Sequence, residues 1–248
     1  MRRVTTVLVA AVALLGLAAA GLVAAGCGDQ SSSVPGDAVA TVGDVPVTKA
    51  DFQKLMSQAR TQMEASGMTV PEQGTPSYHH YVAQIVQYLV QEQVVAQSAA
   101  DLGVSVTDKE VDAQVKQLEE AYGGEKKVLS LLKKQGMTLE LLKRSIRAQT
   151  LAQRAIEVVT KSAKVSEADA KAFWSKHKSQ YTKDKSTNTF AKAKGAIEQE
   201  LLSAKQSQLW SAWLDKRVKE LGVAYAAGFD PAVLNAASSA APSPASGS

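Results

Sequence analysis

The chain of 248 residues has a single cysteine, Cys27, and three histidines, His79, His80 and His177. One cysteine allows no internal disulfide, so the folded part must rely on its hydrophobic core. Adjacent histidines point to different sides of a helix, and no Cys or His stands at ligand spacing from them, so we predict no metal site. The motifs G-x-S-x-G, H-E-x-x-H, G-x-x-x-x-G-K-[ST] and G-x-G-x-x-G are absent as well. We therefore predict no enzyme, no cofactor and no small-molecule substrate.

Aromatic residues are scarce, at 5%, whereas Ala, Leu, Val, Gln and Lys are plentiful. This composition favours helices over strands. A large excess of charge of one sign is also missing. The formal net charge is +4, and loss of residues 1–26 with Arg2 and Arg3 would lower it to about +2. A nucleic-acid-binding protein would carry a strongly basic stripe, so we predict no nucleic-acid partner.

The N-terminus holds the one long apolar run. Arg2 and Arg3 precede an apolar stretch from Val7 to Ala25, a pattern typical of a secretory signal. Cys27 follows Ala24-Ala25-Gly26, which resembles the lipobox of bacterial lipoproteins, although Leu is more frequent where Ala24 stands. The resemblance implies a signal peptide over residues 1–26 and lipid attachment at Cys27. The alternative is an uncleaved membrane anchor. In both cases we expect the chain to be exported and anchored to the outer face of the cytoplasmic membrane.

Composition divides the rest of the chain into three parts. Residues 27–37 are Ser-rich and predict a flexible tether, and residues 227–248, rich in Ala, Ser and Pro, predict a disordered tail. Between them, residues 38–226 predict one domain of about 190 residues. It opens with a hairpin at 38–47, in which Gly43-Asp44 is the turn and Pro46 confines the second strand to a sheet edge. The triplet 223–225 is a candidate strand that returns to this hairpin.

The remaining pattern is helical. Helices are predicted over residues 48–66, 77–102, 107–122, 125–135, 138–161, 166–181 and 189–221, several of which stop at a glycine. Thr48, Thr107 and Ser166 each precede an acidic residue by three positions, which predicts a capping box at three of the helix starts. The helix at 77–102 is apolar nearly all round, so we expect it to be central and wrapped by several others.

Three segments, in this order, resemble the SurA/PrsA-type extracytoplasmic chaperones. They are Ala-Thr-Val-Gly-Asp-Val-Pro-Val-Thr-Lys-Ala-Asp-Phe (40–52), Leu-Val-Gln-Glu-Gln-Val-Val-Ala-Gln-Ser-Ala-Ala-Asp-Leu-Gly-Val (89–104) and Val-Ser-Glu-Ala-Asp-Ala-Lys-Ala-Phe-Trp-Ser-Lys-His-Lys-Ser-Gln-Tyr (165–181). They are similar to the family's opening strand and first helix, its central helix, and the helix before its parvulin isomerase module. The resemblance covers most of residues 38–225. It implies a mainly helical domain of the trigger factor/SurA peptide-binding type with a small N-terminal hairpin.

The sequence departs from full-length members of this family after Tyr181. Only residues 182–188 separate the predicted helix at 166–181 from the last long one, too few for a further domain, which needs roughly 50 residues or more. A parvulin module has a paired-histidine centre, and the three histidines of this chain lie outside that gap. The resemblance therefore implies the chaperone domain without prolyl isomerase activity. Activity at an unrecognised isomerase site is the least favoured alternative.

Trp and Met residues supply the apolar side chains that could contact unfolded polypeptides. Met adapts to varied partners, and residues 67–76, rich in Gly and Pro, predict an exposed loop. The candidates are Met63, Met68, Val70, Trp174, Trp210 and Trp213. Ordinary core packing is the alternative for each Trp, and the favoured one. The Lys-rich stretch 161–194 is interpreted as a solvated face, with attraction to anionic lipid headgroups as the alternative.

These observations lead to one functional hypothesis and one alternative. The hypothesis is a membrane-anchored, ATP-independent extracytoplasmic chaperone that binds unfolded or exported polypeptides. The alternative is an envelope scaffolding lipoprotein that binds one dedicated protein partner.

Overall fold

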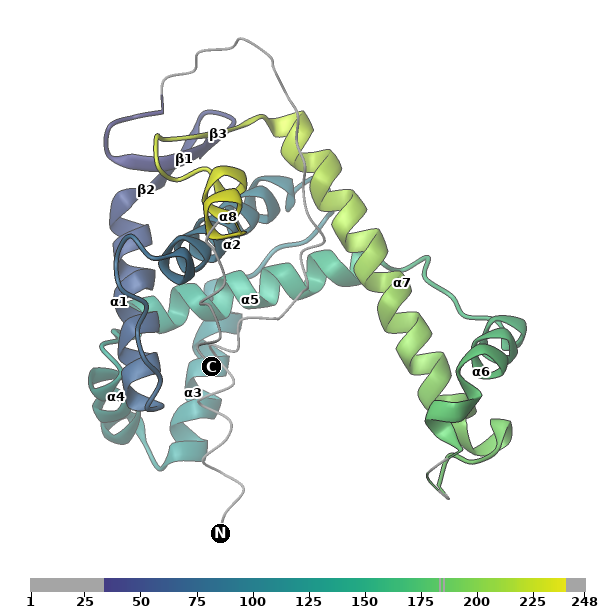
Figure 1. The fold of residues 1–248 in the computed structure, drawn as a ribbon. Coiled ribbons are helices and arrows are strands. Elements are labelled where there is room, and N and C mark those ends of the chain that lie inside the picture. The colour runs from purple at the N-terminus through teal and green to yellow at the C-terminus, as the bar shows by residue number, and fades with distance from the viewer. Residues whose placement is uncertain (1–33, 183, 185, 240–248) are drawn as a thin grey trace, which may run out of the picture.

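The computed structural model describes residues 34–182, 184 and 186–239 (Figure 1). The predicted signal peptide, Cys27, the tether up to residue 33 and residues 240–248 of the predicted tail lie outside the described residues. Within the described part, the chain forms eight helices and a small three-stranded sheet. The predicted fold class, mainly helical with a small N-terminal hairpin, is confirmed.

The sheet joins the two ends of the described chain. Its order is β2-β1-β3, where β1 is Ala38–Val42, β2 is Val45–Thr48 and β3 is Val223–Tyr225, and both pairs are antiparallel. Pro46 lies on the edge strand β2, as predicted, because it has no N–H for a second partner strand. Gly43, with φ of 55°, makes the turn, and its N–H donates to the Gly222 carbonyl at 2.7 Å. The candidate strand at 223–225 is therefore confirmed.

Helix α2, Pro76–Ser98, is the central element of the largest core. It packs against α1 (Lys49–Ala65), α5 (Leu139–Val159), α7 (Phe190–Leu221) and strand β1. Its valines at four-residue spacing, Val82, Val86, Val90 and Val94, are all at most 5% exposed. This confirms the expected central helix. The helix ends four residues before the predicted end at Leu102, and the segment to Gly103 continues in turns.

A second core lies below the first, between α3 (Asp108–Tyr122), α4 (Glu125–Lys134) and the N-terminal half of α5. Val111, Val128, Leu132 and Ile146 are buried in it. Arg147 of α5 holds the chain that enters α3, because its guanidinium donates to the Val106 carbonyl at 2.7 Å. Helix α5 therefore takes part in both cores.

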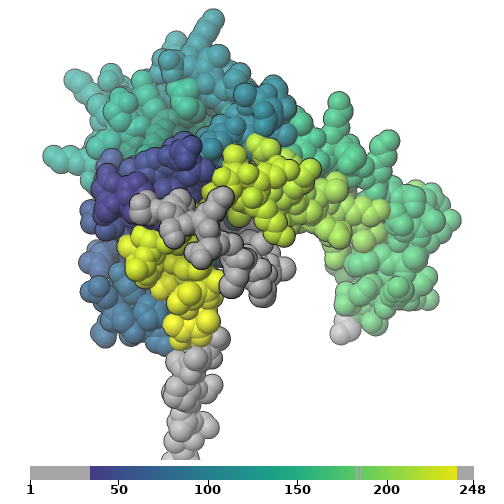
Figure 2. Space-filling model, turned by 90° about the horizontal axis from the view of Figure 1, so that it is seen from above, coloured from purple at the N-terminus to yellow at the C-terminus, as the bar shows by residue number. Residues whose placement is uncertain are grey.

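A third, small core lies apart from the other two. Helix α6, Glu167–Tyr181, packs against the N-terminal half of α7 and buries Ala170, Ala193 and Ile197. We call α6 with α7 up to Leu201 the arm, and the rest of the described chain the body. Figure 1 shows α7 running from the sheet down to α6, and Figure 2 shows the arm projecting from the body with an open hollow beside it.

Two of the three predicted capping boxes are complete. Thr107 with Glu110, and Ser166 with Asp169, exchange both side-chain-to-backbone hydrogen bonds. At the start of α1, Thr48 accepts from the Asp51 N–H at 3.0 Å, but the Asp51 carboxylate pairs with Arg144 of α5 instead of closing the box. The carboxylate of Asp51 thus contributes to a contact between α1 and α5.

The structure corrects the prediction for the C-terminal end of the chain. Residues 227–248 were expected to be a disordered tail, whereas Pro231–Ser239 form helix α8, which packs along α2. Its Leu234 is 8% exposed and belongs to the main core. Composition alone failed here because one leucine and one proline suffice to seat a short Ala-rich helix on an apolar neighbour.

Candidate polypeptide-binding surface

Trp174 lies in the arm, within an aromatic cluster. Its ring centroid is 5.6 Å from that of Tyr181 and 6.4 Å from that of Phe190, so it joins the end of α6 to the start of α7. The Tyr181 hydroxyl donates to Glu200 at 2.8 Å across the two helices. Trp174 is half-buried. Its main contacts are therefore within the arm, and one edge stays accessible.

Ion pairs also hold the arm together. Glu167 of α6 accepts from Lys171 at 2.8 Å and from Lys194 of α7 at 2.7 Å, and these bonds lower its pKa from 4.5 to about 2. Lys205 of α7 reaches Asp169 at 3.0 Å. Because these groups are exposed, each pair adds little to stability. The pairs made by Lys194, and by Lys205 just beyond the arm, set how α6 lies on α7.

Trp210 and Trp213 lie on the part of α7 that belongs to the body. Their rings stack with centroids 4.9 Å apart and an interplanar angle of 20°. Trp210 is 6% exposed and part of the main core, while Trp213 is half-buried at the edge of that core. The structure places Trp210 in core packing, which was the favoured alternative for each Trp.

Met63, Met68 and Val70 lie together at the far end of α1. Met63 is on the last turn of the helix, and the Met68 N–H donates to its carbonyl at 2.8 Å. Met68 is 53% exposed, and Val70 is half-buried in the loop that leads to α2. This loop is one of the few places where a large apolar side chain faces water. The predicted residues thus fall into three groups, and no described pocket unites them.

Sequence reasoning missed two residues of α7. Leu202 and Leu209 are half-buried, yet they belong to none of the three described cores. With Trp213 they follow a spacing of seven and four residues, which places all three on one face of the helix. This face, which we call the α7 stripe, spans the stretch between the arm core and the body core. The spacing was visible in the sequence, but only the extent of the described cores shows that Leu202 and Leu209 belong to none of them.

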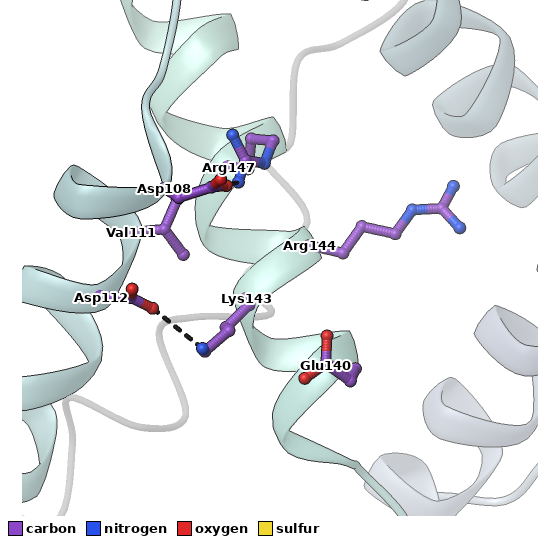
Figure 3. A pocket seen from close by; sticks show the side chains of 7 residues that line it. All are labelled: Asp108, Val111, Asp112, Glu140, Lys143, Arg144 and Arg147. Carbon is purple, nitrogen blue, oxygen red and sulfur yellow. Dashed lines mark hydrogen bonds and ion pairs between the residues drawn. The ribbon is translucent and has the colours of Figure 1, made fainter.

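A pocket lies elsewhere, between α3 and α5, and has a volume of about 460 Å³. Its charged lining is paired within the protein: Lys143 bonds Asp112 at 2.9 Å, and Arg147 bonds Asp108 (Figure 3). Arg144 points away from these pairs (Figure 3). Opposite charges that neutralise each other leave no net attraction for an anion. The pocket is therefore a weak candidate for a ligand site.

Arg144 joins three helices at the body's surface. It contacts Asp51 of α1 at 2.5 Å and Glu92 of α2 at 3.5 Å. Burial alone would raise the pKa of Asp51, but hydrogen bonds from Arg144 and Thr48 outweigh it and the pKa is lowered. Burial raises the pKa of Glu92, and Arg144 offsets only part of that effect. The cluster fixes α5 against α1 and α2, and its atoms are committed to each other.

The described residues offer neither a metal cluster nor a membrane-spanning helix. They contain no group of three or more His, Cys, Asp or Glu side chains arranged to hold a metal ion. No helix among them is both long and apolar enough to cross a membrane.

The family model and the curated relatives that match this chain point to the same protein family. The SurA-like N-terminal domain model matches residues 1–156. The foldase protein PrsA of Clostridium botulinum strain Hall is 32% identical over 141 residues, which are 55% of this chain and 42% of that protein. PrsA of Caldanaerobacter subterraneus subsp. tengcongensis is 26% identical over 161 residues, 62% of this chain and 47% of that protein. The matched region thus spans less than half the length of these relatives. No solved structure matches the chain.

Proposed function

Because this chain belongs to the SurA-like N-terminal domain family, and with it to the SurA/PrsA-type chaperones, we propose that it captures unfolded exported polypeptides without ATP. Outside the cytoplasm no ATP is available to drive release. Binding must then be weak and rapidly reversible, so that a client leaves when its own apolar surface becomes buried by folding. Many weak apolar contacts suit this task better than a deep pocket.

The observation that carries the proposal is the α7 stripe. Leu202 and Leu209 sit between two separate cores, on a helix that borders the hollow between arm and body (Figures 1 and 2). An extended or helical client segment can cover apolar side chains that follow a helical spacing and belong to no core of their own. Trp213 at one end of the stripe and Trp174 in the arm would add aromatic contact area. Met68 and Val70 would form a second, separate contact.

We propose that the chain lacks prolyl isomerase activity. The support is the short connection between α6 and α7, which covers residues 182–189. In full-length members that the sequence resembles, the parvulin module follows the helix that corresponds to α6. Here both flanking residues, Tyr181 and Phe190, belong to the core of the arm.

We further propose that the chain acts at the outer face of the cytoplasmic membrane. The support is the sequence pattern around Cys27, which resembles a lipobox. Residues 34–37 lead directly into β1, so an attached lipid would lie a short tether away from the sheet. The domain would then lie close to clients that emerge at the membrane.

The test is suppression of aggregation by the mature chain, residues 27–248 with Cys27→Ser. An unrelated protein is diluted from denaturant, and light scattering is followed with increasing amounts of the chain and no ATP. We expect suppression near a one-to-one ratio. Failure at large excess of a chain shown to be folded by circular dichroism would refute the chaperone proposal and favour a scaffold for one dedicated partner.

A matched pair of variants tests the stripe. Leu202→Glu with Leu209→Glu places two charges on it, whereas Ser203→Glu with Ser207→Glu places the same charges at exposed positions of the same helix. The first pair should abolish suppression and the second should leave it unchanged. Equal activity of the two pairs would remove the stripe from the proposal.

A further inference from the structure

Helix α8 is a short helix that packs along α2. Its nine residues, Pro231–Ser239, carry no charged side chain and are mostly Ala, Val, Leu and Ser. A helix of this length does not form in water on its own. Its helical state therefore depends on the face of α2 along which it packs.

Apolar contacts and a hydrogen bond seat α8 on the body. Leu234 is 8% exposed and Pro231 is also buried. Phe229, just before the helix, meets Phe52 of α1 edge to face with ring centroids 5.3 Å apart. One polar link is the hydrogen bond between Asn235 and His80 of α2, at 3.1 Å. One leucine, one proline and one aromatic contact form a small apolar anchor.

The hydrogen bonds of the sheet do not involve α8. Strand β3 precedes it, and the Ala226 N–H donates to the Val39 carbonyl at 2.9 Å, which closes the sheet before α8 begins. Residues 227–230 then form a separate link. The helix is the last described element of the chain, and Figure 2 shows it at the surface of the body.

We propose that the face of α2 beneath α8 is a binding groove for short apolar helical segments of clients, and that α8 is its built-in occupant. A helix that lays its apolar side into a groove of another helix is a common mode of peptide recognition. The sequence of α8 itself defines the ligand class: uncharged, with small residues and one leucine that reaches the core. A client segment competes with α8, so α8 sets how readily the chain accepts clients. This inference rests on the proposed function.

The first test opens the groove. In the mature full chain with Cys27→Ser, Leu234→Asp removes the anchor of α8. Val233→Asp is the matched control, because it adds the same charge at a neighbouring position that is 64% exposed. The probe is a fluorescein-labelled peptide with the sequence of residues 229–239. Because affinity falls in proportion to the fraction of open groove, Leu234→Asp should bind the probe at least tenfold more tightly than the control.

The second test closes the groove and does not depend on a destabilising change. His80→Cys with Asn235→Cys is joined by a short bis-maleimide, and the same variant with both thiols capped by N-ethylmaleimide is the control. The crosslinked chain should bind the probe at least tenfold more weakly than the capped chain. Equal probe binding by the crosslinked and the capped chain would overturn the proposal. This outcome decides the matter even if Leu234→Asp fails to fold.

Aggregation assays then separate the two ideas. If the capped chain suppresses aggregation and the crosslinked chain suppresses it equally well, the groove is not a client site, while the chaperone function stands. If neither suppresses aggregation although the probe binds only the capped chain, the chaperone function fails, while α8 remains the displaceable occupant of the groove.

Discussion

Arg217 fastens α7, the helix that carries the arm, to the end of α2. Its Nε donates to the Ser98 hydroxyl at 3.0 Å, and its two terminal nitrogens reach Asp101 at 2.9 Å and Glu220 at 3.0 Å. Ser98 is 0% exposed, whereas the Asp101 side chain is 69% exposed. Arg217→Ala therefore leaves a buried hydroxyl without this donor, and this lost hydrogen bond should lower the free energy of unfolding by about 1–3 kcal/mol. The lost exposed ion pairs add about 0–1 kcal/mol.

We expect Arg217→Ala to lower the free energy of unfolding by about 1–4 kcal/mol. Urea unfolding at 25 °C, followed by far-ultraviolet circular dichroism, measures this difference. Lys216→Ala is the control on the same helix, because its pair with Glu220 is longer, at 3.6 Å, and its side chain is 73% exposed. That change should cost less than about 0.5 kcal/mol.

The double variant Arg217→Ala with Ser98→Ala isolates the buried hydroxyl. Because the group that lost its partner is then absent, about 1 kcal/mol of the loss should return. If Arg217→Ala costs no more than Lys216→Ala, the buried contact does not fasten α7. If the second substitution adds a further loss instead of a recovery, the assigned cause is wrong.

Three further expectations follow from the burial and the ion pairs. Trp210→Ala should lower the free energy of unfolding, measured with urea, by about 3–5 kcal/mol, as the loss of a buried aromatic side chain does. Trp213→Ala should lower it clearly less. Equal small losses for the two variants would contradict core packing at Trp210. Tyr81→Phe should raise the free energy of unfolding by up to about 1 kcal/mol, since the buried Tyr81 hydroxyl has no hydrogen-bond partner, and a loss in the same assay would reveal a hidden partner. Hydrogen bonds from Lys171 and Lys194 depress the pKa of Glu167 from 4.5 to about 2, so its contribution to the arm is complete above about pH 4.5 and is lost as the pH falls toward 2. Glu167→Gln should therefore weaken the acid-dependent change in fluorescence of Trp174, and an unchanged pH profile would refute this role.

Local sequence signals predicted most of the helices and the sheet. Hydroxyl caps such as Thr107 and Ser166 lie at the predicted helix starts, because the cap acts on backbone groups a few residues away. The turn at Gly43-Asp44 and the edge position of Pro46 depend equally on local backbone chemistry. The apolar character of α2 on all sides predicted its central position for the same reason: burial follows from its own side chains.

Tertiary partners explain what the sequence did not reveal. Helix α8 forms because Leu234 finds the main core, a contact between residues far apart in the chain. Asp51 was predicted to complete a capping box. However, Arg144, which lies 93 positions further along the chain, competes for its carboxylate. The α7 stripe escaped notice because its significance depends on where the arm core ends and the body core begins. The candidate Trp residues could be located in helices from the sequence, but not assigned to different cores.

The arm's tip has a consequence for how such a protein changes over evolution. Tyr181 and Phe190 both contact Trp174, and the Thr187 hydroxyl donates to the Tyr181 carbonyl at 2.9 Å. The chain thus leaves the arm and re-enters it at nearly the same place, far from the sheet (Figure 1). A gene segment inserted or deleted at this point would add or remove a whole module while both ends remained fixed by the same aromatic cluster. A chain with a module at this junction and one without it can therefore share one helical framework, and the same junction is a suitable place to graft a reporter protein.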